Sequence, residues 1–475
     1  MIEQFKQLTA DELYQFQKFV YSSYFTSQKN LVKLFNYLQS LYPDISDEAI
    51  SKEKLSAIIY GETNVNDLKI RKLISDFSIL MEKFYTQVEI ENDKTRNEIL
   101  LLGSLRRRGI TKRFEMNCNQ IFKQMEKSYS KDDEYYLNKI NLDNEKFYFN
   151  FSKSKREYNK ELQDKSDHLD YYYMFSKLHT FNEMLHSEGR RNKNNFYSRS
   201  QLSEILSHIK LNKEKIYKDH PNLYIIYIVF LMFDTLDDKY LRELKDYLER
   251  NEKKFKKNKL SYYYHYLTQY YIQKINMGEI EYNEKAFAIY KTMKEKSLFL
   301  MDKMITDEEF NNVVNISLTS MEYSWVDIFI EEYKKHLDPA FANAAYNLAK
   351  AKLIFFRKDY KNIFPFLNEV EYKDPVYYIN AKFLLGRVYF EMKNIEGLRY
   401  IIANLKQYLR TRKDLMLEQI ETIKVFNKYM TDLISLYESN SSEQKSLRII
   451  LKKELDNEKK FVPSKNWFYE KLIEI

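Results

Sequence analysis

Hydrophobic side chains recur every three or four residues along nearly the whole chain, and polar helix caps separate the apolar stripes. The first stripe follows Thr9, which is placed to form a capping box with Glu12. A longer amphipathic pattern predicts one helix over residues 66–89. Farther along, the pattern predicts a helix over 133–164 and a partner over 168–187. Seven glycines and six prolines supply little of the turn chemistry that sheets need, so the sequence predicts an all-α protein.

A repeat of 35 residues lies in the C-terminal third of the chain. This interval separates Trp325, Tyr360 and Ile395, and it also separates Ile328, Ile363 and Leu398. Each set falls at an equivalent point of a helix–turn–helix unit. A period in this range is typical of helical pairs that stack on their neighbours. The repeat therefore predicts an α-solenoid of antiparallel helix pairs rather than one closed globule.

Two of the repeat units carry residues at the spacing that tetratricopeptide repeats use. These positions are Ala351, Ile354, Tyr360, Ile363, Leu367 and Pro375 in one unit, and Leu385, Gly386, Tyr389, Ile395, Leu398 and Ile402 in the next. Over these residues the chain resembles a degenerate tetratricopeptide-repeat array. The resemblance implies stacked helix pairs whose first helices line a concave face. The chain departs from the family where Ile363 and Leu398 replace a small residue, and where Pro365 should distort a helix.

Short motifs near both ends resemble uncharacterised bacterial proteins built from helical repeats. These motifs are the run Leu8–Leu13, the turn Ser23–Thr26 and the pair Trp467–Phe468. No activity comes with that family. The resemblance therefore implies an intracellular, non-enzymatic helical protein.

Differences in helix length and regularity divide the chain into four expected segments. Residues 1–131 are expected to form an N-terminal helical bundle with a helix-turn-helix-like segment, 132–308 an irregular helix-pair solenoid, 309–410 the tetratricopeptide-like repeats, and 411–475 C-terminal capping helices. A terminal repeat exposes an apolar face that has no further neighbour. Trp467 and Leu472 are the candidates to cover it.

The composition says more about the cellular compartment of the protein than about the class of its binding partner. A net charge of +8 is the excess of 77 basic over 69 acidic residues, so it neither demands nor excludes nucleic acid. Cys118 is the single cysteine, which excludes an intrachain disulfide and suits a reducing compartment. Residues 1–8 lack a signal-peptide layout, and the apolar run Leu223–Phe233 is shorter than the ~20 residues that cross a bilayer. We therefore expect a cytoplasmic protein without a membrane segment, in which this run forms a fully buried helix.

Common signatures of catalysis and cofactor binding are missing from the sequence. The glycines form no phosphate-binding loop, and neither a G-x-S-x-G elbow nor an H-E-x-x-H helix occurs. His179, Glu183 and His186 share one helix face, but helical proteins often align two histidines without a metal. Cys118 is expected to be a buried apolar side chain. The sequence therefore predicts a non-enzymatic protein with no catalytic residue, metal ligand or cofactor.

Matching positions of two repeat units predict a groove for a partner. The predicted groove residues are Leu348, Lys352 and Phe356 in one unit, and Asn380, Phe383 and Arg387 in the next. Lys352 and Arg387 are 35 residues apart, so stacked repeats should place them on neighbouring helices. Two cations and an amide with apolar flanks suit a protein or peptide that is acidic or presents a C-terminal carboxylate. The preferred function is therefore a protein- or peptide-binding scaffold, although any single one of these residues also fits a solvated groove wall.

The alternative function is a nucleic-acid-binding regulator whose solenoid senses a ligand. Its nucleic-acid site would be an N-terminal helix-turn-helix-like segment or the basic stretch from Arg250 to Lys259. A short helix, a tight turn and a long helix around residue 61 resemble a helix-turn-helix in outline. Its exposed side would offer Lys69, Arg71 and Lys72, which alternate with Asp76 and Glu82. A plain helical packing module is the better explanation of this mixed surface. Steeply salt-dependent binding of DNA or RNA would separate the two functions.

Overall fold

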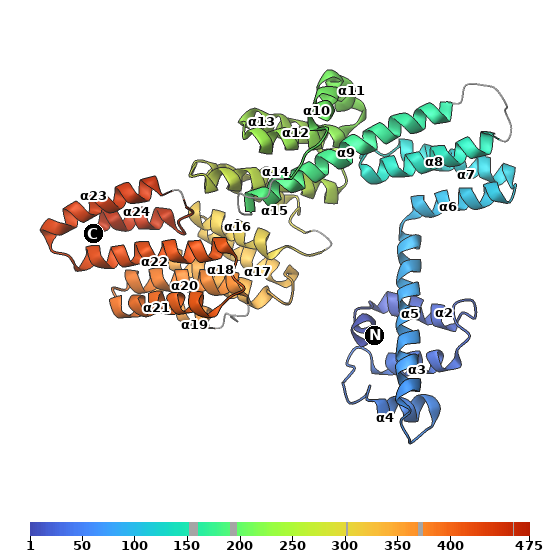
Figure 1. Ribbon diagram of the computed structural model, residues 1–475, viewed down its shortest axis with the longest axis horizontal. Coiled ribbons are helices and arrows are strands. Elements are labelled where there is room, and N and C mark those ends of the chain that lie inside the picture. The colour runs from blue at the N-terminus through green and yellow to red at the C-terminus, as the bar shows by residue number, and fades with distance from the viewer. Residues whose placement is uncertain (152–159, 191–196, 301–302, 369–373, 459) are drawn as a thin grey trace. The chain divides into compact units, whose positions relative to one another are not determined.

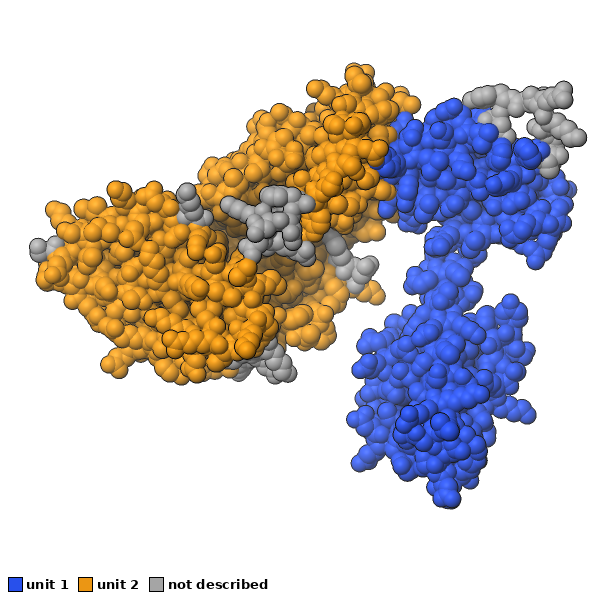
Figure 2. All heavy atoms as spheres, in the orientation of Figure 1, with its two compact units in different colours: residues 1–128, 132–173 blue, residues 129–131, 174–475 orange. Residues whose placement is uncertain are grey.

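The structure, a computed structural model, describes residues 1–151, 160–190, 197–300, 303–368, 374–458 and 460–475 (Figure 1). Within these residues the regular elements are all helical, and no strand is present. The all-α prediction is therefore confirmed. The chain divides into two compact units (Figure 2). Unit 1 contains residues 1–128 and 132–173, and unit 2 contains 129–131 and 174–475. The four expected segments remain a prediction.

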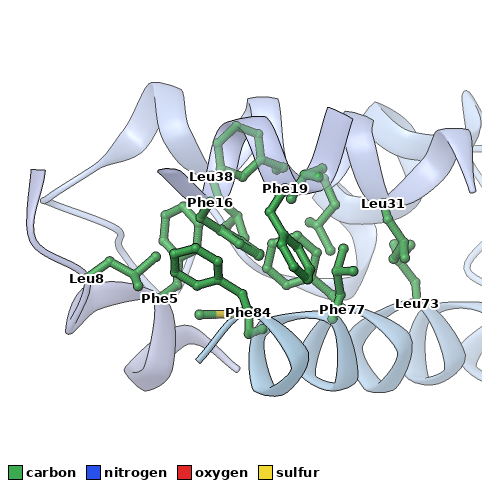
Figure 3. Packing of buried hydrophobic residues seen from close by; sticks show 14 of the residues in the cluster. Phe5, Leu8, Phe16, Phe19, Leu31, Leu38, Leu73, Phe77 and Phe84 are labelled. Carbon is green, nitrogen blue, oxygen red and sulfur yellow. The ribbon is translucent and has the colours of Figure 1, made fainter. Parts of the chain in front are cut away.

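The first helices of unit 1 form a bundle with an aromatic core (Figure 3). They are α1 (Ile2–Lys6), α2 (Ala10–Tyr21), α3 (Lys29–Leu41), α4 (Lys52–Leu55), a π-helical turn (Ser56–Tyr60) and α5 (Asp67–Asn92). The Phe16 ring packs edge-on against Phe77 at 5.8 Å and lies 5.0 Å from the Phe84 ring. These rings come from α2 and α5, so the core ties the short N-terminal helices to the long fifth helix.

The caps predicted for this bundle are present. The Thr9 backbone N–H donates to the Glu12 carboxylate at 2.8 Å, and the Glu12 N–H donates to Thr9 Oγ1 at 3.3 Å. The Asn66 side chain accepts from the Lys69 N–H at 3.1 Å, and α5 accordingly begins at Asp67. The helix predicted over 66–89 is therefore confirmed, with its end three residues later than expected.

The remainder of unit 1 contains a hairpin where the sequence predicted one long helix. The elements are α6 (Lys94–Arg107), α7 (Thr111–Glu126), α8 (Asp133–Phe151) and the first part of α9 (Lys160–Arg190). Lys165 Nζ donates to Asn144 Oδ1 at 3.0 Å, and His168 Nδ1 lies 2.7 Å from Asp143 Oδ2. A single helix would separate these pairs by more than 30 Å. The helix predicted over 133–164 is therefore wrong, and α8 and α9 pack side by side; residues 152–159 lie outside the described part.

Unit 2 begins with helix pairs around one fully apolar helix. The elements after α9 are α10 (Leu202–Leu211), α11 (Lys213–Asp219), α12 (Pro221–Thr235), α13 (Asp238–Asn251), α14 (Lys257–Asn276) and α15 (Tyr282–Glu295). All but one residue between Leu223 and Phe233 are buried, which confirms the buried helix predicted from this run. Tyr270 and Tyr290 are among the largest fully buried side chains. Tyrosine therefore serves as a core residue in this part of the chain.

The warm-coloured half of Figure 1 contains the remaining helices of unit 2. They are α16 (Asp307–Thr319), α17 (Tyr323–Tyr333), α18 (Ala342–Phe356), α19 (Phe364–Asn368), α20 (Pro375–Glu391), α21 (Ile395–Thr411), α22 (Leu417–Glu438), α23 (Ser441–Asn457) and α24 (Lys465–Glu474). Where Pro365 was expected to distort a helix, the chain forms a 3₁₀ turn at Tyr360–Asn362 followed by the five-residue α19.

These helices pack in a regular order. We call α16, α18, α20 and α22 the first helices of their pairs, and α17, α19, α21 and α23 their mates. Each first helix contacts its own mate, and α16, α18 and α20 each also contact the next first helix. Ile363 and Leu398 are fully buried at matching positions, whereas Ile328 is 60 % exposed. The earliest unit therefore departs from the 35-residue register, because the core residues of α17 are Val326, Phe329, Ile330 and Tyr333.

Candidate binding face of the first helices

The cations predicted to line a groove lie on neighbouring first helices of unit 2. Lys352 belongs to α18 and Arg387 to α20, and both are half-buried. Lys352 Nζ donates to Asn315 Oδ1 of α16 at 2.9 Å. We call the side of α16, α18 and α20 that carries Asn315, Lys352 and Arg387 the first-helix face. Three successive helices thus contribute polar side chains to one surface.

The pKa of Lys352 is lower than that of an ordinary lysine. Burial and, to a lesser extent, the positive charge of Arg387 together lower the pKa of its ammonium group to about 8. Its only hydrogen-bond partner within the described residues is the neutral amide of Asn315. No carboxylate in the described part of the chain pairs with this ammonium group, so the described surroundings leave its positive charge uncompensated.

Arg387 is held in place by an aromatic ring rather than by an acid. Its guanidinium carbon lies 4.6 Å from the centre of the Phe355 ring, in the geometry of a cation–π contact. Its Nε atom is buried and has no hydrogen-bond partner in the described structure. Burial lowers the pKa of Arg387 to about 10, although the charges of Glu391 and Glu470 act in the opposite direction. Neither acid forms an ion pair with it.

The other predicted groove residues divide between core and surface. Leu348 is 1 % exposed, and Phe383 is 5 % exposed with its ring stacked 4.1 Å from Phe426. Both belong to the core, so the predicted groove is corrected to exclude them. Phe356 and Asn380 are half-buried, and the Asn380 side-chain amide donates to the Val376 carbonyl at 2.9 Å.

The C-terminal helix α24 covers part of the first helices beyond Arg387. Trp467 Nε1 donates to Glu391 Oε1 at 2.6 Å, and Lys471 Nζ lies 2.9 Å from the same carboxylate. The Trp467 ring packs edge-on against Phe390, and Phe468 packs against Phe426. Trp467 and Leu472 are buried, as expected of residues that cover the end of the chain's packing. The role of Glu391 as the anchor of α24 had no signal in the sequence.

Most of the cations predicted for nucleic-acid binding are paired with acids. Lys69 Nζ lies 2.9 Å from Glu62 Oε1, and Arg71 Nε lies 2.6 Å from Asp67 Oδ2. Lys72 is exposed on the same helix, α5. Phosphate contacts need positive charge that is not already neutralised. The surface that carries these residues therefore has mixed charge rather than a basic patch.

The histidine row of α9 is occupied by packing and hydrogen-bond contacts. His179 Nε2 lies 2.9 Å from the Tyr262 hydroxyl, and its Nδ1 lies 3.7 Å from Glu183. The His186 ring packs edge-on against Phe233 at 4.5 Å. Across the described ranges, no three His, Cys, Asp or Glu side chains are grouped so that they could hold a metal ion. Cys118 is buried in unit 1, and burial raises the pKa of its thiol, so the predicted apolar role fits its surroundings.

Comparison with known proteins identified no relative of this chain. No protein-family model, curated protein or solved structure matches the chain. None of the helices in the described ranges combines the length and hydropathy that a membrane crossing requires. The arrangement of residues on the first-helix face is therefore the basis for a functional assignment.

Proposed function

We propose that the chain is a non-enzymatic scaffold that binds a protein or peptide on the first-helix face of unit 2. The observation that carries this proposal is the position of Lys352 and Arg387 on adjacent helices, where neither forms an ion pair with a carboxylate of the described residues. Half-buried cations are destabilising unless something compensates them. A partner that brings negative charge to this face would supply the compensation.

The order of helix contacts supports a solenoid resembling tetratricopeptide repeats as the scaffold. Each first helix from α16 to α20 contacts its mate and the next first helix, which is the nearest-neighbour packing of a stacked repeat. In such a stack the first helices line the concave side, where an extended peptide or a helix can lie. A single buried thiol suits a reducing compartment, which we propose to be the cytoplasm.

The nucleic-acid alternative draws less support from the geometry. Two of its three cations, Lys69 and Arg71, already pair with carboxylates of the same bundle. A regulator of this kind would need a basic surface elsewhere in the bundle. The scaffold is therefore the function that the described residues favour.

The test is selection of a random peptide library with free C-termini on the immobilised full chain. The matched variant reverses both cations of the face, Lys352→Glu with Arg387→Glu. The control variant, Lys358→Glu with Lys393→Glu, reverses two exposed lysines that are also 35 residues apart but lie at the turns that follow α18 and α20. We expect peptides that bind the wild type and the control but not the matched variant. Absence of any retained peptide would overturn the scaffold proposal, and equal retention by the matched variant would move the site off this face.

A further inference from the structure

The helix pair α6–α7 of unit 1 carries most of the net charge of the chain. From Lys94 to Lys127 there are nine basic and three acidic residues, a net charge of +6, whereas the whole chain carries +8. Arg106 is half-buried and pairs with Glu145 of α8 at 2.7 Å. The other basic residues are all exposed: Lys94, Arg96, Arg107, Arg108, Lys112, Arg113, Lys123 and Lys127. Positive charge is therefore concentrated on the surface of one hairpin.

The acids of the hairpin reduce this charge only in part. Glu98 is half-buried and lies 3.9 Å from Lys94, and Glu126 pairs with Lys139 of α8. The third acid, Glu115, is exposed. The excess of positive charge is a property of the whole hairpin, so it does not depend on whether any single cation has a partner. Helix α5, in contrast, has the mixed charge described above.

A hydrogen-bonded turn brings the cations of the two helices together. Gly109 adopts the left-handed conformation, with φ of 70°, and its N–H donates to the Arg106 carbonyl at 3.0 Å. The Ile110 N–H donates to the Leu105 carbonyl at 3.0 Å, which completes a Schellman motif. Helix α7 begins at the next residue, Thr111. The backbone therefore holds the basic end of α6 beside the basic start of α7, with Ile110 at the tip.

The stability of the two helices accounts for only some of these cations. Arg107 and Arg108 lie at the end of α6, where the helix dipole favours positive charge. Lys112 and Arg113 lie in the first turn of α7, where the dipole disfavours positive charge. That turn contains no acid, and its N-cap residue forms no side-chain hydrogen bond. The cations at the start of α7 therefore cost stability, which indicates that they serve a contact outside the fold.

Aliphatic side chains are exposed among the cations. Leu100, Leu101, Ile110 and Met116 are between 42 % and 58 % exposed. Single exposed apolar residues are common on protein surfaces, but these four lie within one short hairpin. Leu101 and Met116 each lie about 8–9 Å from the turn along their helix axes, on either side of Ile110. The tip of the hairpin thus presents apolar groups surrounded by positive charge.

This combination fits a lipid surface better than a nucleic acid. Proteins that bind single-stranded nucleic acid stack its bases on aromatic rings. The exposed aromatic residue of α7 is Phe122, and its ring centre already lies 4.3 Å from Lys139 Nζ and 4.4 Å from Lys146 Nζ. Aliphatic side chains gain more at the boundary between lipid headgroups and acyl chains, where neighbouring lysines and arginines meet anionic headgroups.

We infer that the α6–α7 hairpin binds the surface of a membrane that contains anionic lipids. The exposed cations contact the headgroups, and the side chains of Leu100, Leu101, Ile110 and Met116 enter the outer edge of the apolar layer. Such a contact requires no helix that crosses the bilayer. The inference goes beyond the proposed peptide-binding function and rests on unit 1 alone. Failure of either one therefore leaves the other standing.

The experiment measures sedimentation of the full chain with phosphatidylcholine vesicles that contain or lack phosphatidylglycerol. We expect sedimentation only with the vesicles that contain phosphatidylglycerol, and less of it as salt is added. Lys112→Glu with Arg113→Glu should weaken binding by at least about thirtyfold, because each basic residue near an anionic surface contributes about fivefold in affinity. Leu101→Ser with Met116→Ser should weaken it by about tenfold without any change in charge.

Two control variants change exposed residues elsewhere in unit 1. Lys29→Glu with Lys83→Glu makes the same change in net charge on α3 and α5. Leu68→Ser with Ile79→Ser removes two exposed apolar side chains of α5. Both controls should bind vesicles like the wild type. Circular dichroism should show wild-type helix content in all four variants, because every replaced side chain is exposed.

Four outcomes would overturn the inference. The first is no sedimentation with phosphatidylglycerol vesicles even at low salt. The second is equal binding by Lys112→Glu with Arg113→Glu and by its charge control, which would exclude a local site. The third is release by inorganic phosphate that exceeds release by chloride at equal ionic strength, which would assign a phosphate site. The fourth is binding of single-stranded RNA, lost in the same hairpin variant, without sedimentation with vesicles; this result would assign the hairpin to nucleic acid.

Discussion

Replacing Lys352 with methionine should stabilise the unliganded protein. Lys352→Met removes a half-buried positive charge and keeps an unbranched apolar side chain of similar length. Asn315 loses its partner but is exposed, so water can replace the lost hydrogen bond. Removing a residue that served only to stabilise the fold would be expected to destabilise the protein. The direction of this effect therefore separates a binding role from a structural one.

The magnitude follows from the proton equilibrium of the lysine. A pKa of about 8, against an ordinary value of 10.5, disfavours the charged form in the folded chain by roughly 3 kcal/mol. Partial exposure to solvent reduces this penalty, so we expect Lys352→Met to raise the free energy of unfolding by about 1–3 kcal/mol near pH 7. The unfolded chain binds more protons between pH 8 and 10.5, so wild-type stability rises with pH in that window. The advantage of the variant should therefore be complete below pH 8 and fade towards pH 10.5.

Urea unfolding followed by tryptophan fluorescence measures this effect. Both tryptophans, Trp325 and Trp467, belong to unit 2, so their signal reports on the unit that contains Lys352. Lys424→Met, at an exposed lysine of α22, is the matched control and should change stability little. A variant no more stable than the wild type near pH 7 would refute the reasoning. A gain of the same size near pH 10 would do so as well, because the charge would then not be its cause.

Three further predictions concern the neighbours of this site. Trp467→Ala should weaken the packing of α24 by about 3–5 kcal/mol. Trp467→Phe should weaken it by less, because the phenyl ring restores the packing but not the hydrogen bond to Glu391. Amide hydrogen exchange across α24 measures this effect, and unchanged exchange in Trp467→Ala would contradict the prediction. Gly386→Ala would place a Cβ 3.2 Å from Cζ of the fully buried Phe426. We expect the free energy of unfolding, measured with urea, to fall by up to about 2 kcal/mol in total, because the steric contact outweighs the gain in helix propensity. A stabilised variant would show that the ring can move. Arg387→Gln should raise the pKa of Lys352 by removing a like charge, and competitive acetylation over a pH series, with Lys382 as internal reference, should show the shift. An unchanged Lys352 profile would mean that burial alone sets its pKa.

Local sequence signals were enough to predict the helical class and most of the helix pairs. The buried helix α12 and the capped start of α5 follow from apolar runs and capping residues, which act within a few positions of the chain. The α8–α9 hairpin was missed because its helical pattern continues from residue 133 to 164 without a strong stop signal. The contacts that define it, such as Asp143 with His168, join residues that no helix period connects. Such pairings depend on tertiary structure and leave little local trace.

The candidate site was predictable to the extent that it follows the repeat. The 35-residue interval placed Lys352 and Arg387 on adjacent helices, because equal positions in successive units share one face. Leu348 and Phe383 were assigned to the same face by counting positions from the repeat starts, and each lies four residues before a cation. Four residues turn a helix by about 40° beyond a full rotation, and here that turn directs both side chains into the core. The anchoring of α24 on Glu391 depends on a contact across 76 residues and could not be read from either segment.

The repeat places like charges close together, and a binding site for an acidic partner would make use of that repulsion. When stacked units carry cations at equal positions, the helices place like charges beside one another, and folding must either pair them or tolerate their repulsion. Lys350 pairs with Asp327 and Glu331, whereas none of the acids that the structure describes pairs with Lys352. Glu391 lies one turn after Arg387 on α20, where it could form an ion pair with that residue. Its carboxylate instead binds Trp467 and Lys471 of α24. Helix α24 thus engages a carboxylate whose charge acts on Arg387. A variant in which α24 detaches, such as Trp467→Ala, should therefore free Glu391 for Arg387 and weaken binding of the peptides selected from the library, although it changes neither cation.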